Sequence, residues 1–559
     1  MNKYKLLTAT ALFAVGAFGL AACDKQAAMD DTPAMTAENL KGHVAYLADD
    51  RMKGRDVGTP EHREASEYIA NFYKDLGLKP MGENGTYFQE VPFFSLQSNQ
   101  DSSWLSYTAG GETKTFTSDE WVSVGNAKMD EMAANGDLVF VGYGIHAPEQ
   151  GHDDYAGVDV TGKIILRIAG TPAGTTGLQE FKAEQGAAGV IGLLKPSENS
   201  AAMFKNYHGF FAGARLNMMK KGDEKPAGDE HATAFISAEA ATGLFAAAGM
   251  DYADAVKMAD TKGFTAKAMG ISGDMKQVTA SSMITSPNVA AVLEGSDPDL
   301  KDEYVIISAH SDHVGMCAHV EGRDTAAADD TICNGALDNA SGTATTMEVA
   351  KALSQLETAP RRSVMFLNVT AEEKGLLGSQ YFAEYPTVPA DKITANVNID
   401  MPILFYDFAD VVAFGAEHSS IWDIAETALS EINVGLAEDP MPEQRLFTRS
   451  DHYNFVKKGV PSVFLMTGPT SVNDDPATPV KEREGYKEFY KFLNTNYHSA
   501  ADDMAQPIMW DVHAKYTLAN YKIIEALANA DVEARWNEGN EYGDKYAPGK
   551  PRAAAPAAD

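Results

Sequence analysis

The spacing of hydrophobic and polar positions divides the chain into three stretches. Residues 37–80 contain segments such as HREASEYIANFYKDLG, whose apolar residues recur every three or four positions, and this spacing predicts amphipathic helices. Residues 135–285 contain short apolar runs such as LVFVGYGI and GKIILRIAG, which are typical of β-strands. Residues 288–535 alternate apolar runs of strand length with helical patterns. This alternation predicts a mainly parallel sheet with helices on both faces.

The last stretch predicts strands and helices in strict alternation. The strands are EYVIISAH, RSVMFLNVT, ANVNID and VPSVFLM, and the helices are SGTATTMEVAKALSQL, GLLGSQYFAEY, SIWDIAETALSEI and WDVHAKYTLANYKIIEALANA. We therefore expect an α/β fold, a mainly parallel mixed sheet flanked by helices. The chain then divides into six predicted parts. They are a signal peptide (1–22), a flexible tether (23–36), the first part of the α/β domain (37–134), a small β-rich insert (135–285), the main part of the α/β domain (286–535) and a disordered tail (536–559).

The N-terminal residues have the pattern of an export signal. Lys3 and Lys5 precede an apolar stretch from Leu6 to Ala22, which is slightly shorter than the roughly 20 residues of a membrane-spanning helix. The sequence LAAC, ending at Cys23, resembles a bacterial lipobox, which implies cleavage before Cys23 and attachment of a lipid to its sulfur. We expect an exported protein, lipid-anchored in the bacterial cell envelope, that faces the periplasm or the exterior and meets the membrane only through this anchor. A plain signal peptide with a coincidental Cys23 is the alternative.

Charge and cysteine content narrow the classes of function. The 559 residues include 46 basic and 79 acidic side chains, a formal net charge of −33, which argues against nucleic acid as a partner. Three cysteines are too few for a disulfide-built scaffold. Because export places Cys317 and Cys333 in an oxidising compartment, we expect a disulfide between them, with two unpaired thiols as the alternative.

Polar side chains follow the predicted strands of the α/β domain. Ligands of an open α/β sheet bind beyond the carboxyl ends of its strands, so these side chains are expected to converge at one edge. Each alone has a simpler explanation, because an aspartate can cap a helix and paired glutamates can begin one. The joint pattern favours a common site. The residues are His310, Asp338, Glu372, Glu373, Asp400 and His498.

The chemistry of this set suits divalent metal ions, above all zinc. Imidazole nitrogens and carboxylate oxygens are ligands that zinc accepts. Four carboxylates packed together without cations would repel one another and take up protons. Two divalent ions would remove that repulsion, with one carboxylate shared between them. A further carboxylate that binds no metal would serve as a general base.

Five segments resemble the M28 zinc peptidases, a family that includes bacterial leucyl-type aminopeptidases. They are SAHSDHVG, NGALDNASG, TAEEKGLLGS, NVNIDM and NYHSAADD, and they occur in the family's order. The resemblance covers residues 37–130 and 288–535 and implies the zinc-exopeptidase, phosphorylase/hydrolase-like fold. Between these ranges, GYGIHAPE, DDYAGVDVTGKIIL and KAEQGAAGVIGLL resemble the protease-associated (PA) domain, a small β-rich insert in several peptidase families.

The resemblance also assigns roles within the set. Glu372 would be the general base. Asp312, two residues after His310, would orient that imidazole. The ligands of two Zn²⁺ ions would be His310 and Asp400 for the first, Glu373 and His498 for the second, and Asp338 bridging both.

Further histidines lie close to these segments. The sequence RSDHY at 449–453 resembles a family segment that borders the site without binding zinc. The sequence alone leaves His452 and His498 as alternatives for the last ligand. We expect His498, with His452 and Asp451 beside the ligands or the substrate. We expect His313 to be a loop residue at the rim of the site.

The implied function is a metallo-exopeptidase that acts on peptide substrates. The resemblance favours an aminopeptidase that works through a metal-bridging hydroxide, with Glu372 as general base. A carboxypeptidase or a glutaminyl-cyclase-like enzyme on the same fold is the alternative. A non-catalytic receptor on a peptidase fold is a different class, but such proteins usually lose ligands, and all are present here. The chain has no G-x-S-x-G elbow and no H-E-x-x-H motif, which disfavours a serine hydrolase and a zincin.

Overall fold

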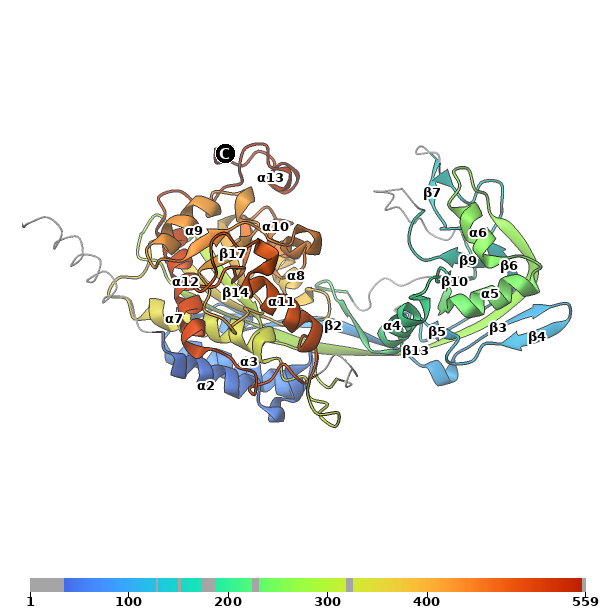
Figure 1. Cartoon of the computed structure of the whole chain (residues 1–559), viewed down its shortest axis with the longest axis horizontal. Helices are drawn as coiled ribbons and strands as arrows, with labels where there is room; N and C mark the ends of the chain where they lie inside the picture. Colours follow the sequence, from blue (N-terminus) through green and yellow to red (C-terminus); the bar gives the residue numbers. More distant parts are fainter. Residues whose placement is uncertain are drawn as a thin grey trace, which may run out of the picture. The chain divides into compact units, whose positions relative to one another are not determined.

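Figure 1 shows a computed structural model of the chain, which describes residues 35–126, 129–148, 152–172, 186–223, 231–317 and 325–554. The predicted signal peptide, its lipidation site Cys23 and most of the tether lie outside these residues. The chain forms two compact units. The first runs up to Gln89 and resumes at Pro287, and the second is Glu90–Ser286. Within the described ranges, no helix is both long enough and apolar enough to cross a membrane.

The first unit contains the predicted alternation of strands and helices. All four predicted strands and all four predicted helices are present. Its strands are β1 (Lys79–Pro80), the end of β13 (Lys267–Leu293), β14 (Tyr304–His310), β15 (Ser363–Val369), β16 (Ile393–Ile399), β17 (Asp410–Phe414), β18 (Gly435–Ala437) and β19 (Ser462–Thr467). Its helices are α2 (Ala37–Leu47), α3 (Pro60–Asp75), α7 (Gly342–Ser354), α8 (Leu377–Glu384), α9 (Ile421–Ser430), α10 (His452–Val456), α11 (Glu484–Thr495), α12 (Trp510–Asn529) and α13 (Glu541–Tyr546), with short turns at η1 (Asp50–Arg55) and η5 (Ala336–Ser341).

The centre of this unit is a row of parallel strands. β15, β14, β16 and β19 are parallel neighbours in that order. β13 pairs antiparallel with β15 on one side, and β17 pairs antiparallel with β19 on the other. Ala309 of β14 is level with Asn368 of β15 and Ile399 of β16, so these three strands end at the same edge. The predicted mainly parallel mixed sheet, flanked by helices, is confirmed.

Helices cover both faces of the sheet because both faces of its strands are apolar. In β14, Val305, Ile307 and Ala309 belong to the larger core, which also includes residues of α2, α3, α7, α9 and α12. Ile306 points to the opposite face and belongs to a smaller core with residues of α8 and α10. The unbroken apolar runs of the central strands are therefore what a sheet buried on both sides requires.

The second unit is rich in strands and begins earlier than predicted. It starts at Glu90, and the predicted boundary at residue 135 is wrong. The reason is long-range pairing: β3 (Trp104–Ala109) pairs with β13, and β5 (Trp121–Ser123) pairs with β12 (Ala232–Ile236). Its other elements are β2 (Phe88–Ser98), β4 (Glu112–Thr115), β6 (Glu131–Phe140), β7 (His146–Ala147), β8 (His152–Asp153), β9 (Ile164–Ile168), β10 (Gly189–Leu193), β11 (Arg215–Met218), α4 (Ser200–Ala212), α5 (Ala238–Ala247) and α6 (Tyr252–Ala259).

The C-terminal segment is ordered through residue 554, so the prediction of a disordered tail from residue 536 is wrong over that range. Trp536 is 2% exposed, and its indole N–H donates to the carbonyl of Gly459 at 3.0 Å. Tyr542 of α13 packs against Phe447 with ring centroids 5.1 Å apart. The low-complexity composition of the last residues hid these aromatic anchors. Residues 555–559 lie outside the described part of the chain.

Candidate metal centre

Several candidate site residues lie at or just after the ends of the central strands, which are level with one another. His310 is the last residue of β14, and Asp400 follows the last residue of β16. Glu372 and Glu373 lie in the turn between β15 and α8. Because parallel strands that end together present their following residues at one edge, the sheet itself brings these side chains to one place.

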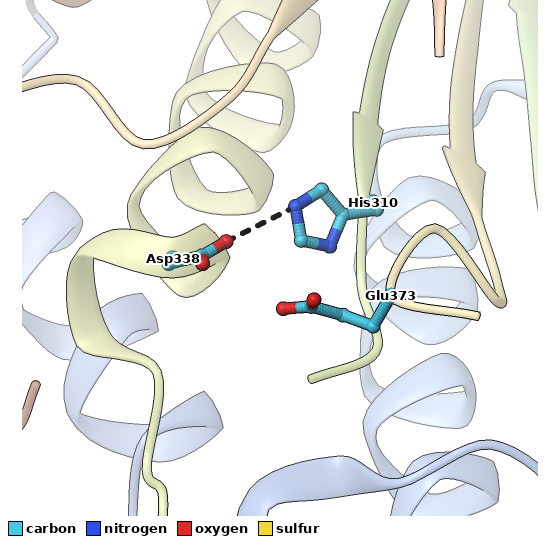
Figure 2. Close-up of side chains that lie close together, drawn as sticks. All are labelled: His310, Asp338 and Glu373. Atoms are coloured by element: carbon cyan, nitrogen blue, oxygen red, sulfur yellow. Dashed lines mark ion pairs between the residues drawn. The ribbon is translucent and has the colours of Figure 1, made fainter. Parts of the chain in front are cut away.

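Asp338 stands between two histidines. Its Oδ1 lies 3.3 Å from Nε2 of His310, and its Oδ2 lies 3.3 Å from Nε2 of His498. His310 Nε2 is also 3.1 Å from Oδ1 of Asp400, and His498 Nε2 is 2.9 Å from Oε2 of Glu373. Each oxygen of Asp338 therefore faces a separate set of one imidazole and one further carboxylate, which is the arrangement of a bridging ligand. Figure 2 shows the carboxylate of Asp338 directed toward the ring of His310, with the carboxylate of Glu373 below that ring in this view. Single ligand atoms of these three residues all lie within 4.8 Å of one another.

The pKa values of Asp338 and His498 depend on the charges of neighbouring site residues. Burial raises the pKa of Asp338, but hydrogen bonding to His310 and His498 outweighs burial and holds that pKa well below its usual range. Burial lowers the pKa of His498, yet Asp338 and Glu373 raise it to about 10. The protons on the imidazoles thus act as the positive partners of the carboxylates, and metal binding replaces such protons.

The residues present fit divalent metal ions such as zinc. Two imidazoles and three carboxylates form the donor set that zinc accepts. His498 Nε2 is buried and lacks a hydrogen-bond partner of good geometry, although Oε2 of Glu373 is 2.9 Å away. This separation places the nitrogen and the oxygen within reach of a common cation.

Glu372 is separate from these close contacts. Among the described residues, no histidine, lysine or arginine nitrogen lies within ion-pair distance of its carboxylate. Burial raises the pKa of Glu372 well above its usual value, and repulsion from Asp400, Glu373 and Asp451 raises it further. A carboxylate beside the ligands that does not itself bind a metal can accept and return a proton.

The side chain of Asp312 contacts the backbone of Glu372 and Glu373 rather than the ring of His310. The Nδ1 atom of His310 is 3.2 Å from the main-chain oxygen of Asp312 and 3.9 Å from its carboxylate. The carboxylate of Asp312 instead accepts the backbone N–H groups of Glu372 and Glu373, at 3.2 and 3.4 Å. The predicted orientation of His310 therefore comes from the main chain, and the side chain of Asp312 holds the turn that carries both glutamates.

His313 belongs to the cluster, so the prediction that it lies at the rim of the site is wrong. Its side chain is fully buried, and its Nδ1 lies 2.7 Å from Oε1 of Glu373. His313 and His498 together lower the pKa of Glu373 to about 2, against the opposing effects of burial and of Asp338. The segment after His310 directs the side chain of His313 toward Glu373. The sequence did not predict this burial, because a single histidine in a polar segment has no periodic pattern.

His452 and Asp451 differ from His498 in their surroundings. The ring of His452 packs against Phe447 and Phe464, with centroids 5.4 and 5.8 Å apart, and burial lowers its pKa to about 3. Asp451 is fully buried, and burial raises its pKa to about 7. Within the described part of the chain, neither side chain lies within ion-pair distance of a ligand, whereas His498 contacts two of the predicted ligands.

Two further residues support the centre and were not singled out from the sequence. The carboxylate of Asp502 accepts the backbone N–H groups of Leu337 and Asp338 at 2.9 and 3.0 Å. Tyr497 stacks on His498 with ring centroids 3.8 Å apart. Both residues lie in the NYHSAADD segment, and their place beside a predicted ligand was the available signal.

The predicted disulfide is present. Cys317 and Cys333 are bonded, with their Cα atoms 5.7 Å apart. The bond joins the segment that follows His313 to the segment that precedes Asp338, so it closes a loop between two parts of the cluster.

Parts of the chain are similar to known proteins. Residues 288–524 match the model of peptidase family M28. The probable leucine aminopeptidase 2 of Aspergillus oryzae is 28% identical over 232 residues, which are 39% of this chain and 40% of that protein. The leucine aminopeptidase 2 of Trichophyton equinum is 30% identical over 229 residues, 40% of this chain and 41% of that protein. The chain thus spans about 40% of the length of these curated relatives.

A solved structure shares the fold. The aminopeptidase from Aneurinibacillus sp. strain AM-1 superposes with a TM-score of 0.51 at 20% sequence identity, over 90% of this chain and 94% of that chain. At this identity the likeness concerns the fold alone.

Proposed function

We propose, on the premise that residues 288–524 form a domain of peptidase family M28, that this protein is a zinc-dependent aminopeptidase that removes N-terminal residues from peptides. The observation that carries the proposal is the position of Asp338, whose two oxygens each lie 3.3 Å from a different imidazole. A carboxylate that bridges two ions needs further ligands on each side, and each oxygen of Asp338 faces one imidazole together with one further carboxylate.

The ligand sets follow from these contacts. His310, Asp338 and Asp400 would hold one ion, and Asp338, Glu373 and His498 would hold the other. When bound, two zinc ions supply Lewis-acid chemistry, which lowers the pKa of a water and polarises a peptide carbonyl.

The remaining residues of the site act on protons and on ligand geometry. Glu372 would take the proton of the attacking water and return it to the leaving amine. Asp312 would hold Glu372 within reach, because its carboxylate accepts the backbone N–H of Glu372 at 3.2 Å. His313 would fix the position of Glu373 through the 2.7 Å contact between Nδ1 and Oε1.

The choice of aminopeptidase is supported by the names of the relatives, which are leucine aminopeptidases. The test compares purified protein on four substrates: leucyl-p-nitroanilide, its N-acetylated form, an N-blocked dipeptide with a free carboxylate, and a peptide with N-terminal glutamine. We expect hydrolysis of leucyl-p-nitroanilide, no hydrolysis of the two N-blocked substrates, and no cyclisation of the N-terminal glutamine. Hydrolysis of the N-blocked dipeptide would make the protein a carboxypeptidase, and cyclisation of the glutamine would make it a cyclase.

The proposal also places the protein outside the cytoplasm, as a lipoprotein anchored through Cys23. The Cys317–Cys333 disulfide supports export, because disulfides persist in oxidising compartments. The β-rich composition of the second unit supports its interpretation as a PA domain. Mass spectrometry of the mature N-terminal peptide tests the anchor: a diacylglyceryl group on Cys23 is expected, and an unmodified Cys23 would contradict it.

A further inference from the structure

Arg55 is a buried cation beside the metal centre. Its side chain is 1% exposed, although it comes from the N-terminal part of the chain, outside the residues that match the family model. Burial lowers its pKa to about 10, and Asp312, Asp502, Asp338 and Glu373 oppose this shift. Arg55 therefore remains charged at neutral pH, and the carboxylates of the site are the negative groups that act on it.

The guanidinium of Arg55 binds the main chain of two segments that carry ligands. Its Nε donates to the carbonyl of Ser311 at 3.1 Å, next to His310. Its other nitrogens donate to the carbonyls of Asn334 at 2.6 Å and Gly335 at 3.1 Å, in the loop that leads to Asp338. One rigid side chain therefore spans the segments that hold His310 and Asp338.

The backbone around Arg55 continues this connection. The carbonyl of Arg55 accepts the N–H of His313 at 3.3 Å, and the carbonyl of Gly54 accepts the N–H of Gly315 at 3.1 Å. Gly54 has a φ of +69°, and a Cβ there would lie 2.4 Å from the carbonyl oxygen of Cys333. Only glycine permits this close approach. The turn that carries Gly54 and Arg55 therefore packs directly against the segments around Gly315 and Cys333.

The pattern of partners distinguishes Arg55 from a buried arginine in an ion pair. Among the described residues, no carboxylate oxygen lies within 4.0 Å of its guanidinium, and its direct partners are carbonyls, including that of Leu47. Arg362 is equally buried, but its Nε donates to the carboxylate of Glu303 at 2.8 Å. A buried charge without a paired carboxylate is costly and is offset here by carbonyl dipoles and by the nearby acidic cluster.

We propose that Arg55 is a positioning residue of the metal centre. Its planar fork fixes the separation of the segments that carry His310 and Asp338, and its charge offsets part of the repulsion among the carboxylates. This inference rests on the proposed function, because it assigns Arg55 to the zinc site. It also makes the N-terminal segment a necessary part of that site.

The test compares the full-length wild type, Arg55→Lys and Arg362→Lys. Lysine keeps the charge but cannot reproduce the fork of Arg55. Zinc affinity is measured by competition with a chromogenic chelator, and the Co²⁺-substituted proteins are compared by their visible absorption bands. We expect Arg55→Lys to raise the zinc Kd roughly tenfold or more and to shift the Co²⁺ bands. We expect Arg362→Lys to lower the unfolding temperature but to keep the zinc Kd within about twofold of wild type.

The outcomes separate this inference from the proposed function. A wild-type protein that binds no zinc contradicts both. A wild type that binds zinc, together with an Arg55→Lys variant whose Kd and Co²⁺ bands match those of Arg362→Lys, overturns the inference alone. If Arg55→Lys does not fold, Arg55→Gln replaces it, because glutamine can donate to one of the same carbonyls but lacks the planar guanidinium that reaches both segments. That variant is expected to raise the zinc Kd several-fold, and an unchanged Kd would overturn the inference.

Discussion

The Nδ1 atom of His313 lies 2.7 Å from Oε1 of Glu373, and both side chains are buried. The other oxygen of Glu373 lies 2.9 Å from Nε2 of His498. A second histidine on the far oxygen of a ligand fixes which oxygen faces the metal, and outer partners of this kind contribute about 10- to 100-fold in metal affinity.

We therefore predict that His313→Asn weakens binding of one zinc ion by a factor of about 10 to 100. The measurement is calorimetric titration of zinc into metal-free protein. His452→Asn is the matched control, because His452 is also buried but packs between aromatic rings. The control is expected to keep both zinc ions, and loss of zinc from it instead would identify His452 as a ligand.

Replacing the proposed general base should separate chemistry from metal binding. Glu372→Gln keeps the shape of the side chain but cannot accept a proton, so we expect kcat to fall by a factor of about 10² to 10⁴. Zinc content, measured by elemental analysis, is expected to stay unchanged. The matched variant Glu373→Gln is expected to lose zinc together with activity. Near-normal turnover by Glu372→Gln would refute its role.

Asp502 holds the backbone of the bridging ligand and offers a third comparison. Asp502→Asn leaves one oxygen to accept the N–H groups of Leu337 and Asp338, so we expect zinc affinity to fall by about tenfold. Asp503→Asn is the adjacent control, since Asp503 accepts the N–H of Ala505 instead. Equal zinc affinities for the two variants would show that Asp502 does not position Asp338.

Buried neutral histidines predict how stability depends on pH. His513 is buried between Thr345 Oγ1 and the carbonyl of Ser341, and burial lowers its pKa to about 3. The unfolded chain binds this proton near pH 6.5, so between about pH 3 and 6.5 the unfolded state binds more protons than the folded state. The unfolding free energy therefore falls as pH decreases below about 6.5, by up to about 1.4 kcal/mol per pH unit for this residue.

Urea unfolding of wild type and His513→Gln between pH 4.5 and 7.5, both in excess zinc, measures this contribution. Glutamine keeps a polar side chain but does not titrate, so the variant should show a smaller loss of stability toward acid pH. The difference between the two proteins isolates His513 from other titrating groups. Identical pH profiles would show that His513 takes up its proton in the folded state.

Much of the fold, and the position of most candidate ligands at one edge of the sheet, could be predicted from the sequence. The parallel strands β14, β15, β16 and β19 are buried on both faces, so each reads as an unbroken apolar run. Because parallel strands end at one edge, the polar residue that follows each run could be assigned to a common site. His310, Glu373 and Asp400 follow this rule directly.

The remaining features depend on contacts between distant parts of the chain. Arg55 lies more than 250 residues before Ser311 in sequence, as its hydrogen bond spans 256 positions, and no local pattern predicts such a pair. The same holds for the start of the second unit, where β3 and β5 pair with strands more than 100 residues later. His313 and Trp536 escaped prediction because isolated residues in irregular segments carry no periodic signal of burial.

The most direct test of the account is a zinc titration of chelator-treated protein, followed by the rate of leucyl-p-nitroanilide hydrolysis. The account predicts that chelation abolishes hydrolysis and that added zinc restores it, with the full rate reached at two zinc ions per chain. Hydrolysis that persists after the metal has been removed, or a full rate at a single zinc ion per chain, would contradict a centre in which Asp338 bridges two ions.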